Sequence, residues 1–225
     1  MSGSPQSGPS PMDFSRMSTH QTPQFTPGQN FQIVGKDSQL LFFNLKPGEE
    51  VIMQPGSMVH YVEGLEAEVQ MGNFCACCAG GEDMFKAIYR NVTGDLKSIS
   101  VAPLFPSKII PVRMDQHPMG LTVKKGGFVA ADSRNVQISA RMVSSLGMAL
   151  GSGGNLFMLN VAGSGTVFLD GGGTVMSKML GQGEVILFDQ KALVACSNSC
   201  NLSIRRSGDC MMMMCGGLGL VVTEV

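Results

Sequence analysis

Sulfur-bearing side chains are the most unusual chemical feature of this sequence, which contains 18 Met and seven Cys in 225 residues. One cluster lies near residue 75 and another near residue 212, and each immediately precedes a Gly-Gly pair, as Met148 does more loosely between them. Together they form a candidate contact face made of Cys75, Cys77, Cys78, Met148, Met211, Met212, Met213, Met214 and Cys215.

Three interpretations of these sulfur atoms stay open. Thiolate and thioether ligands together suit Cu(I), and thiolates alone suit Zn²⁺. A soft, Met-rich patch instead suits a protein partner or a lipid surface, and cysteines beside a membrane are targets for palmitoylation. The simplest alternative is that Cys and Met fill a core of small residues. Whether a metal is bound is therefore unknown from the sequence.

No arrangement of polar residues points to catalysis. The three histidines, His20, His60 and His117, do not form the paired pattern on one strand that a metal site in a β-barrel requires. Gly163-Ser164-Gly165 is only a fragment of a dinucleotide fingerprint, because the third Gly is missing and a strand follows it. A phosphate-binding Gly-Lys-Ser/Thr loop and a serine nucleophile elbow are absent from the sequence as well. We predict that the chain is not an enzyme, with no catalytic residues and no cofactor.

The charge pattern disfavours nucleic acid as a partner. Lys and Arg total 16 against 17 Asp and Glu, which gives a net charge of −1 and no basic patch for a polyanion. Charged residues make up 15% of the chain, against roughly 25% in an average soluble domain. This low content indicates surface that is covered in an assembly.

The composition of the chain and the spacing of its turn-forming residues predict an all-β fold. The 29 glycines disfavour helices, and apolar or β-branched runs of four to eight residues alternate with Gly, Pro, Asn and Asp from Phe31 onward. Residues 1–26 are rich in Ser, Pro and Gln, so we predict a disordered tail there and a single β domain over 27–225.

The β domain contains an internal repeat. Three segments resemble one another, 56–62, 126–132 and 191–197, with Met58, Phe128 and Leu193 at equivalent positions. A repeat of this length indicates β units arranged around a common core. The third repeat is incomplete after the Gly216–Val225 segment, so we expect an open sheet edge and a homo-oligomer, because open edges seek partners.

Several motifs resemble the family named for altered inheritance of mitochondria, or mitochondrial biogenesis, whose fold is similar to that of the tryptophan RNA-binding attenuation protein. They lie in the expected order within residues 28–222: Pro47–Val51, Pro55–Val59, Ala102–Pro111, Lys125–Ala130 and Gly163–Leu169. The resemblance implies a pseudo-threefold repeat barrel or prism of short antiparallel strands, double-stranded β-helix-like, with no established catalytic activity. Leu104 and Ser107 depart from the Pro and Gly expected there, and a closing Gly-Pro-Gly strand is missing.

These observations predict a non-catalytic, oligomerising scaffold or assembly factor with a Cys/Met-rich contact face. Its partners would be further copies of the chain or the other subunits of a larger complex, and contact with a membrane surface is left open. The alternative is a small-ligand or soft-metal-binding β-barrel. The sequence begins with no secretory signal and one Arg in its first 26 residues, so we expect a cytoplasmic protein, with mitochondria as the alternative from the family resemblance.

Overall fold

The computed structural model describes residues 28–71, 85–143, 156–204 and 220–224. Antiparallel strands dominate it, with two short 3₁₀ turns, η3 (Met114–Gln116) and η5 (Gln190–Ala192). The all-β prediction is confirmed. The strands are β1 (Phe31–Val34), β2 (Leu40–Leu45), β3 (Glu50–Met53), β4 (Met58–Tyr61), β5 (Leu65–Met71), β6 (Phe85–Asn91), β7 (Lys97–Val101), β8 (Lys108–Arg113), β9 (Leu121–Lys124), β10 (Phe128–Ala131), β11 (Gln137–Val143), β12 (Leu156–Ala162), β13 (Thr166–Gly171), β14 (Val185–Asp189), β15 (Ala195–Ser197), β16 (Asn201–Ile204) and β17 (Leu220–Glu224).

The strands recur in units with the same pairing. Strands β2 to β7 form the first unit and β8 to β13 the second, each with six strands in equivalent order. In the third unit, β14, β15, β16 and β17 occupy the second to fifth positions. Even irregularities repeat, since the pairing of the third strand with the sixth shifts register between Met58 and His60 and again between Phe128 and Ala130.

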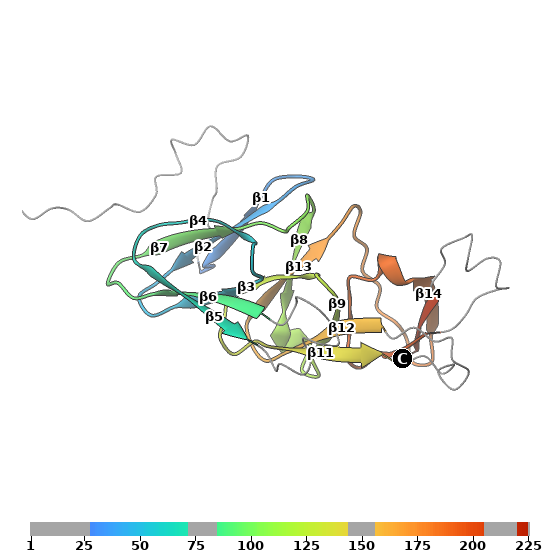
Figure 1. Ribbon diagram of the computed structural model, residues 1–225. Helices are drawn as coiled ribbons and strands as arrows, with labels where there is room; N and C mark the ends of the chain where they lie inside the picture. The colour runs from blue at the N-terminus through green and yellow to red at the C-terminus, as the bar shows by residue number, and fades with distance from the viewer. Residues whose placement is uncertain (1–27, 72–84, 144–155, 205–219, 225) are drawn as a thin grey trace, which may run out of the picture.

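Of the four described sheets, the two middle ones are shared between consecutive units, whereas the first sheet adds β1 to strands of the first unit and the last sheet contains strands of the third unit (Figure 1). The strand orders are β1-β2-β7-β4 in sheet A, β5-β6-β3-β10-β13-β8 in sheet B, β11-β12-β9-β15 in sheet C and β14-β17-β16 in sheet D. In sheet B, the fourth, fifth and second strands of the first unit therefore join the third, sixth and first strands of the second unit. We call the pairing of a second strand with the third strand of the following unit a junction.

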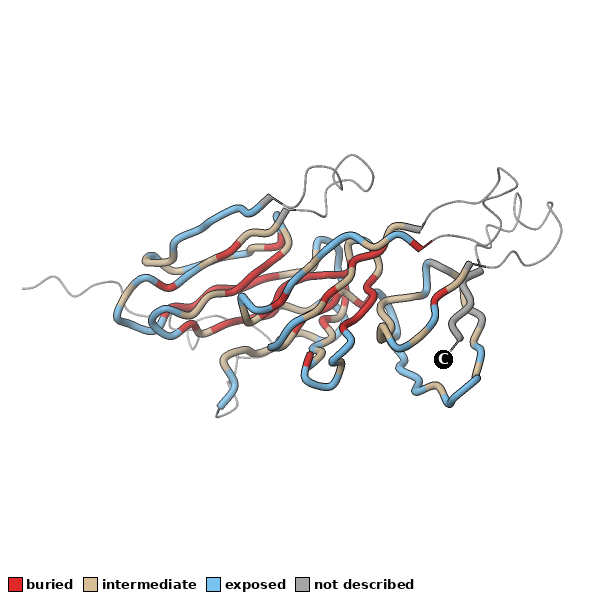
Figure 2. The backbone as a smooth tube through the Cα atoms, turned by 90° about the horizontal axis from the view of Figure 1, so that it is seen from below, coloured by how far each residue is buried: buried red, intermediate tan, exposed pale blue. Residues whose placement is uncertain are grey.

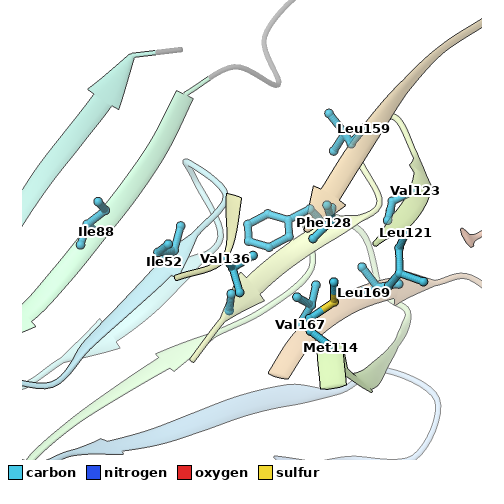
Figure 3. Close-up of a cluster of buried hydrophobic side chains, with 12 residues drawn as sticks. Ile52, Ile88, Met114, Leu121, Val123, Phe128, Val136, Leu159, Val167 and Leu169 are labelled. Atoms are coloured by element: carbon cyan, nitrogen blue, oxygen red, sulfur yellow. The ribbon is translucent and has the colours of Figure 1, made fainter. Parts of the chain in front are cut away.

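The sheets stack on one another through hydrophobic cores. One cluster joins β2 and β7 of sheet A to sheet B, and includes Phe43 and Phe168. A second cluster joins sheet B to β9 and β12 of sheet C, with Phe128 among its buried side chains (Figure 3). Because sheet B is covered on both faces, its central strands lack polar alternation, and all four residues of β10 are buried.

The sheets do not close into a barrel, which corrects that part of the expected architecture. Strands β4 and β14 lie at opposite ends of the molecule (Figure 1). Closure would require β4 to pair with a second strand, but within the described residues its sheet partner is β7 alone. Buried residues concentrate in the first two units, whereas the region near the C-terminus is mostly intermediate or exposed (Figure 2). The predicted tail lies outside the described residues, and the single-domain organisation stays a prediction.

Candidate functional site

All nine residues of the predicted Cys/Met contact face lie outside the described residues, within 72–84, 144–155 and 205–219. The strands around them are described, and each segment connects the fourth strand of a unit to the fifth. The flanking pairs are Met71 with Phe85, Val143 with Leu156, and Ile204 with Val221. The three segments thus occupy equivalent places in the topology. Their joining into one face stays a prediction.

Two further cysteines, Cys196 in β15 and Cys200, are described as free thiols. The pKa of the Cys196 thiol is raised to about 11, chiefly by burial and also by the neighbouring Cys200, while Arg141 acts in the opposite direction. At neutral pH Cys196 is therefore a protonated thiol, a poor nucleophile and a poor metal ligand. Across the described ranges, no group of three or more His, Cys, Asp or Glu side chains is arranged to hold a metal ion.

A polar cluster that sequence reasoning missed lies on sheet C. Arg141 Nη1 donates to Thr122 Oγ1 (2.7 Å) and to Asn198 Oδ1 (2.8 Å). Asn198 Nδ2 donates to Asn160 Oδ1 (2.7 Å) and to the backbone oxygen of Met119 (2.9 Å). The side chains satisfy one another, so the cluster ties β9, β11 and β12 to the turn after β15.

Comparison of the repeats could have revealed this cluster. Thr122 and Asn160 face each other across β9 and β12, as Ile52 and Ile88 do across β3 and β6. The apolar pair is buried in the core between sheets B and C. Thr122 and Asn160 stand at the positions of these two isoleucines. The equivalent face of sheet C is therefore not covered by an apolar core of the same kind.

His60 is a strand residue in β4. Its Nδ1 atom shares a hydrogen bond with the Ser100 hydroxyl, and its ring lies 5.9 Å from that of Phe42. Burial lowers the pKa of the His60 imidazole, which is therefore neutral at physiological pH. His60 thus contributes to packing within sheet A.

Two strand edges form the candidate interaction surface. Strand β4 ends sheet A and β14 ends sheet D, although β10 and β3, their equivalents in sheet B, are interior strands. Apolar side chains stand exposed along both strands: Val59 (52% exposed) and Tyr61 (44%) on β4, and Val185 (48%) on β14. These edges combine backbone hydrogen-bonding groups with apolar side chains, which is the chemistry that recognises another strand.

No helix in the described part of the chain has the length and apolar character needed to cross a bilayer. None of the curated proteins compared with the chain matches it.

Solved structures support the fold. Seven chains match, among them the X-ray crystal structure of protein SPYM3_0169 from Streptococcus pyogenes, with 23% sequence identity and a TM-score of 0.65. The match covers 86% of this chain and 87% of the streptococcal one. At this identity the likeness concerns the fold alone.

The sequence comparison identifies the family. Residues 31–225, which include all the described strands, match the family described as "Mitochondrial biogenesis AIM24". The resemblance inferred from the motifs is thereby confirmed. The chain belongs to the mitochondrial biogenesis AIM24 family.

Proposed function

We propose that this chain is a non-catalytic scaffold or assembly factor that associates with copies of itself and with other proteins. The observation that carries the proposal is the pair of strand edges, β4 and β14, which end their sheets although their equivalents in sheet B, β10 and β3, are interior. An exposed strand edge with apolar side chains is a template for pairing with another chain. The low content of charged residues, 15%, supports a largely covered surface.

The Cys/Met-rich segments are the proposed contact face for other proteins or for a membrane surface. Their support is topological, since all three connect equivalent strands. Met side chains adapt to irregular partner surfaces because they are unbranched and polarizable. The family description associates the protein with mitochondrial biogenesis, and we propose a mitochondrial setting for the assembly. Fractionation of cells that express the tagged full chain tests this, because recovery only in the cytosol would contradict it.

Native mass spectrometry tests the scaffold function most directly. The protein is purified from its own source without a chelator, and the assembly mass and bound adducts are read together. A heavy complex with several copies or other chains, and no stoichiometric metal, supports a scaffold. A small species that carries stoichiometric copper or zinc overturns it in favour of the soft-metal-binding alternative.

A variant set locates the contact face. Replacing Met211, Met212, Met213 and Met214 with Ser removes the soft side chains of the third segment. We expect other chains to leave the complex while copies of this chain remain together. Replacing the exposed Met176 and Met179 with Ser is the matched control, and an equal loss in both variants would contradict the assignment.

A further inference from the structure

We propose that β14 of one copy pairs antiparallel with β4 of a second copy, in the register of the internal junctions. This inference deepens the proposed self-association and rests on it. Two junctions exist among the described strands, β3 with β10 and β9 with β15. Strand β14 is the second strand of its unit and β4 is the third strand of its unit. A junction pairs a second strand with a third strand, so β14 and β4 are the two kinds of strand that a junction requires.

The other sheet edges do not show this complementarity. Strands β5, β11 and β16, the fourth strands of their units, end their sheets in every unit, so their exposure is part of the repeat. Strand β15 lacks a sixth strand beside it, but β7 and β13, the described sixth strands, are paired on both sides. Among the described edge strands, β4 and β14 form the pair whose positions in the repeat correspond to an internal junction.

Pairing within one copy is prevented by the shape of the molecule. Strands β4 and β14 lie at opposite ends of the stack of sheets (Figure 1). The contact must therefore join two copies head to tail. Repetition of such a contact produces a ring or a filament rather than a closed dimer.

The internal junctions predict the register. Gln54 N donates to Val129 O at the first junction and Lys124 N to Val194 O at the second, both at 2.9 Å. The equivalent residue of β14 is Asp189, whose N–H is expected to donate to the carbonyl of Val59 in the second copy.

The opposing Cα partners follow the same pattern. Met53 faces Ala130 at the first junction, and Val123 faces Ala195 at the second. At the new junction Phe188 therefore faces His60, and Leu187 faces Tyr61. Main-chain bonds to β14 come from Val59 and Tyr61, because junction bonds involve alternate residues and the His60 backbone points toward β7.

The resulting sheet resembles sheet B. Three strands of sheet D and four of sheet A would form a continuous series, β16-β17-β14-β4-β7-β2-β1, in which the first six match the order of β5-β6-β3-β10-β13-β8. The exposed side chains of Val59 and Tyr61 would then lie beside β14. The junction thus covers apolar surface at both ends of the molecule.

Edge variants of the full chain test the pairing. The double variant Val59→Lys with Tyr61→Lys places two charges on the β4 edge, as natural edge strands do to prevent pairing. We expect the concentration needed for self-association, measured by analytical ultracentrifugation, to rise at least about tenfold, which corresponds to about 1.4 kcal/mol. Val69→Lys on β5, whose side chain is 65% exposed, is the control and should leave assembly unchanged.

A mixing experiment tests that the contact is head to tail. The β4 variant retains an intact β14, and the variant Val185→Glu retains an intact β4. Each alone should be monomeric, but an equimolar mixture should form a heterodimer and nothing larger. Recovery of a dimer on mixing also shows that both variants are folded.

A charge exchange tests the register itself. Asn198 N donates to Gly120 O at the second junction (3.0 Å), and the equivalent residues at the new junction are Glu63 and Val185. Val185→Glu should weaken assembly, Val185→Lys should preserve it, and Val185→Glu combined with Glu63→Lys should restore it.

Two outcomes overturn the inference. Assembly of the wild-type chain that is unaffected by the β4 variant would place the contact elsewhere and leave the scaffold function standing. A purified wild-type chain that stays monomeric at every concentration would contradict pairing between copies. Native mass spectrometry of protein from its own source would then decide separately whether the chain binds other subunits.

Discussion

The packing of sheet B on sheet C and the packing of sheet C on sheet D involve equivalent strands but differ in the buried residues described between them. Among the residues whose burial is described, twelve form the cluster between sheets B and C, whereas three, Val143, Met158 and Leu202, form the cluster between sheets C and D. On the later face, Thr122 and Asn160 replace the isoleucines of the earlier one. Most of the described core therefore lies in the first two units, and we expect the third unit to be held more weakly.

The largest effect is expected from a cavity in the stronger core. Phe128 is 5% exposed and lies within the cluster between sheets B and C (Figure 3). Phe128→Ala should reduce the free energy of unfolding by about 4 kcal/mol, because the removed ring leaves a space that two rigid sheets cannot close. Urea denaturation followed by circular dichroism measures this. A loss under about 1 kcal/mol would show that the core is not tightly packed.

Two substitutions on one strand test whether the two cores differ in packing. Leu159 and Met158 are neighbours in β12, 5% and 3% exposed, and they pack in the stronger and the weaker core respectively. Leu159→Ala should cost about 3 kcal/mol and Met158→Ala about 1.5 kcal/mol, since the smaller cluster has more freedom to relax. Equal losses in urea denaturation would contradict the difference between the two packings.

Replacing Thr122 with Ile, the residue type at the equivalent core position, should not make the protein more stable. Thr122→Ile removes the hydroxyl that accepts a hydrogen bond from Arg141. We expect a loss of about 1–3 kcal/mol, because a partly buried guanidinium then loses an acceptor. Thr122→Ser keeps the hydroxyl and is the control. A stabilised Thr122→Ile variant would mean that the polar cluster contributes nothing to the packing of sheet C.

The smallest effect is a pH dependence centred on His60. Its pKa is lowered from 6.5 by burial, so the folded state takes up a proton less readily than the unfolded state. Stability should be constant above pH 6.5 and should fall as the pH decreases from 6.5 through the lowered pKa of the folded state. Thermal melts of the wild type and of His60→Asn test this, and an identical slope in both would assign the effect to another group.

The local features of the fold were predictable from the sequence. Gly56 and Gly126 have φ of +84° and +71°, and each opens the turn into the third strand of its unit, where the aligned segments placed them. The short apolar run Thr166–Leu169 also indicated a strand, which extends to Gly171 in the structure. The candidate Cys/Met face remains a prediction, because its residues lie outside the described part of the chain.

The sequence predicted an open sheet edge from the incomplete third repeat, but it predicted neither the polar cluster nor that β4 and β14 end their sheets, and β17 of the third repeat lies between β14 and β16. Arg141, Thr122 and Asn198 are far apart in the chain and meet only because β9, β11 and the turn after β15 belong to one sheet. Likewise, the short run Val185–Asp189 resembles any buried strand, and nothing local shows that it ends a sheet.

The amino-acid sequence by itself determined the all-β class, the recurring turns and the family, because backbone preferences and apolar spacing act over a few residues. Tertiary structure alone decided that sheets B and C are shared between consecutive units, that the series stays open, and that β4 and β14 end it. The physical reason is that strand pairing is a contact between distant segments: equivalent strands carry similar local signals, and only the stacking of the sheets selects which of them become neighbours.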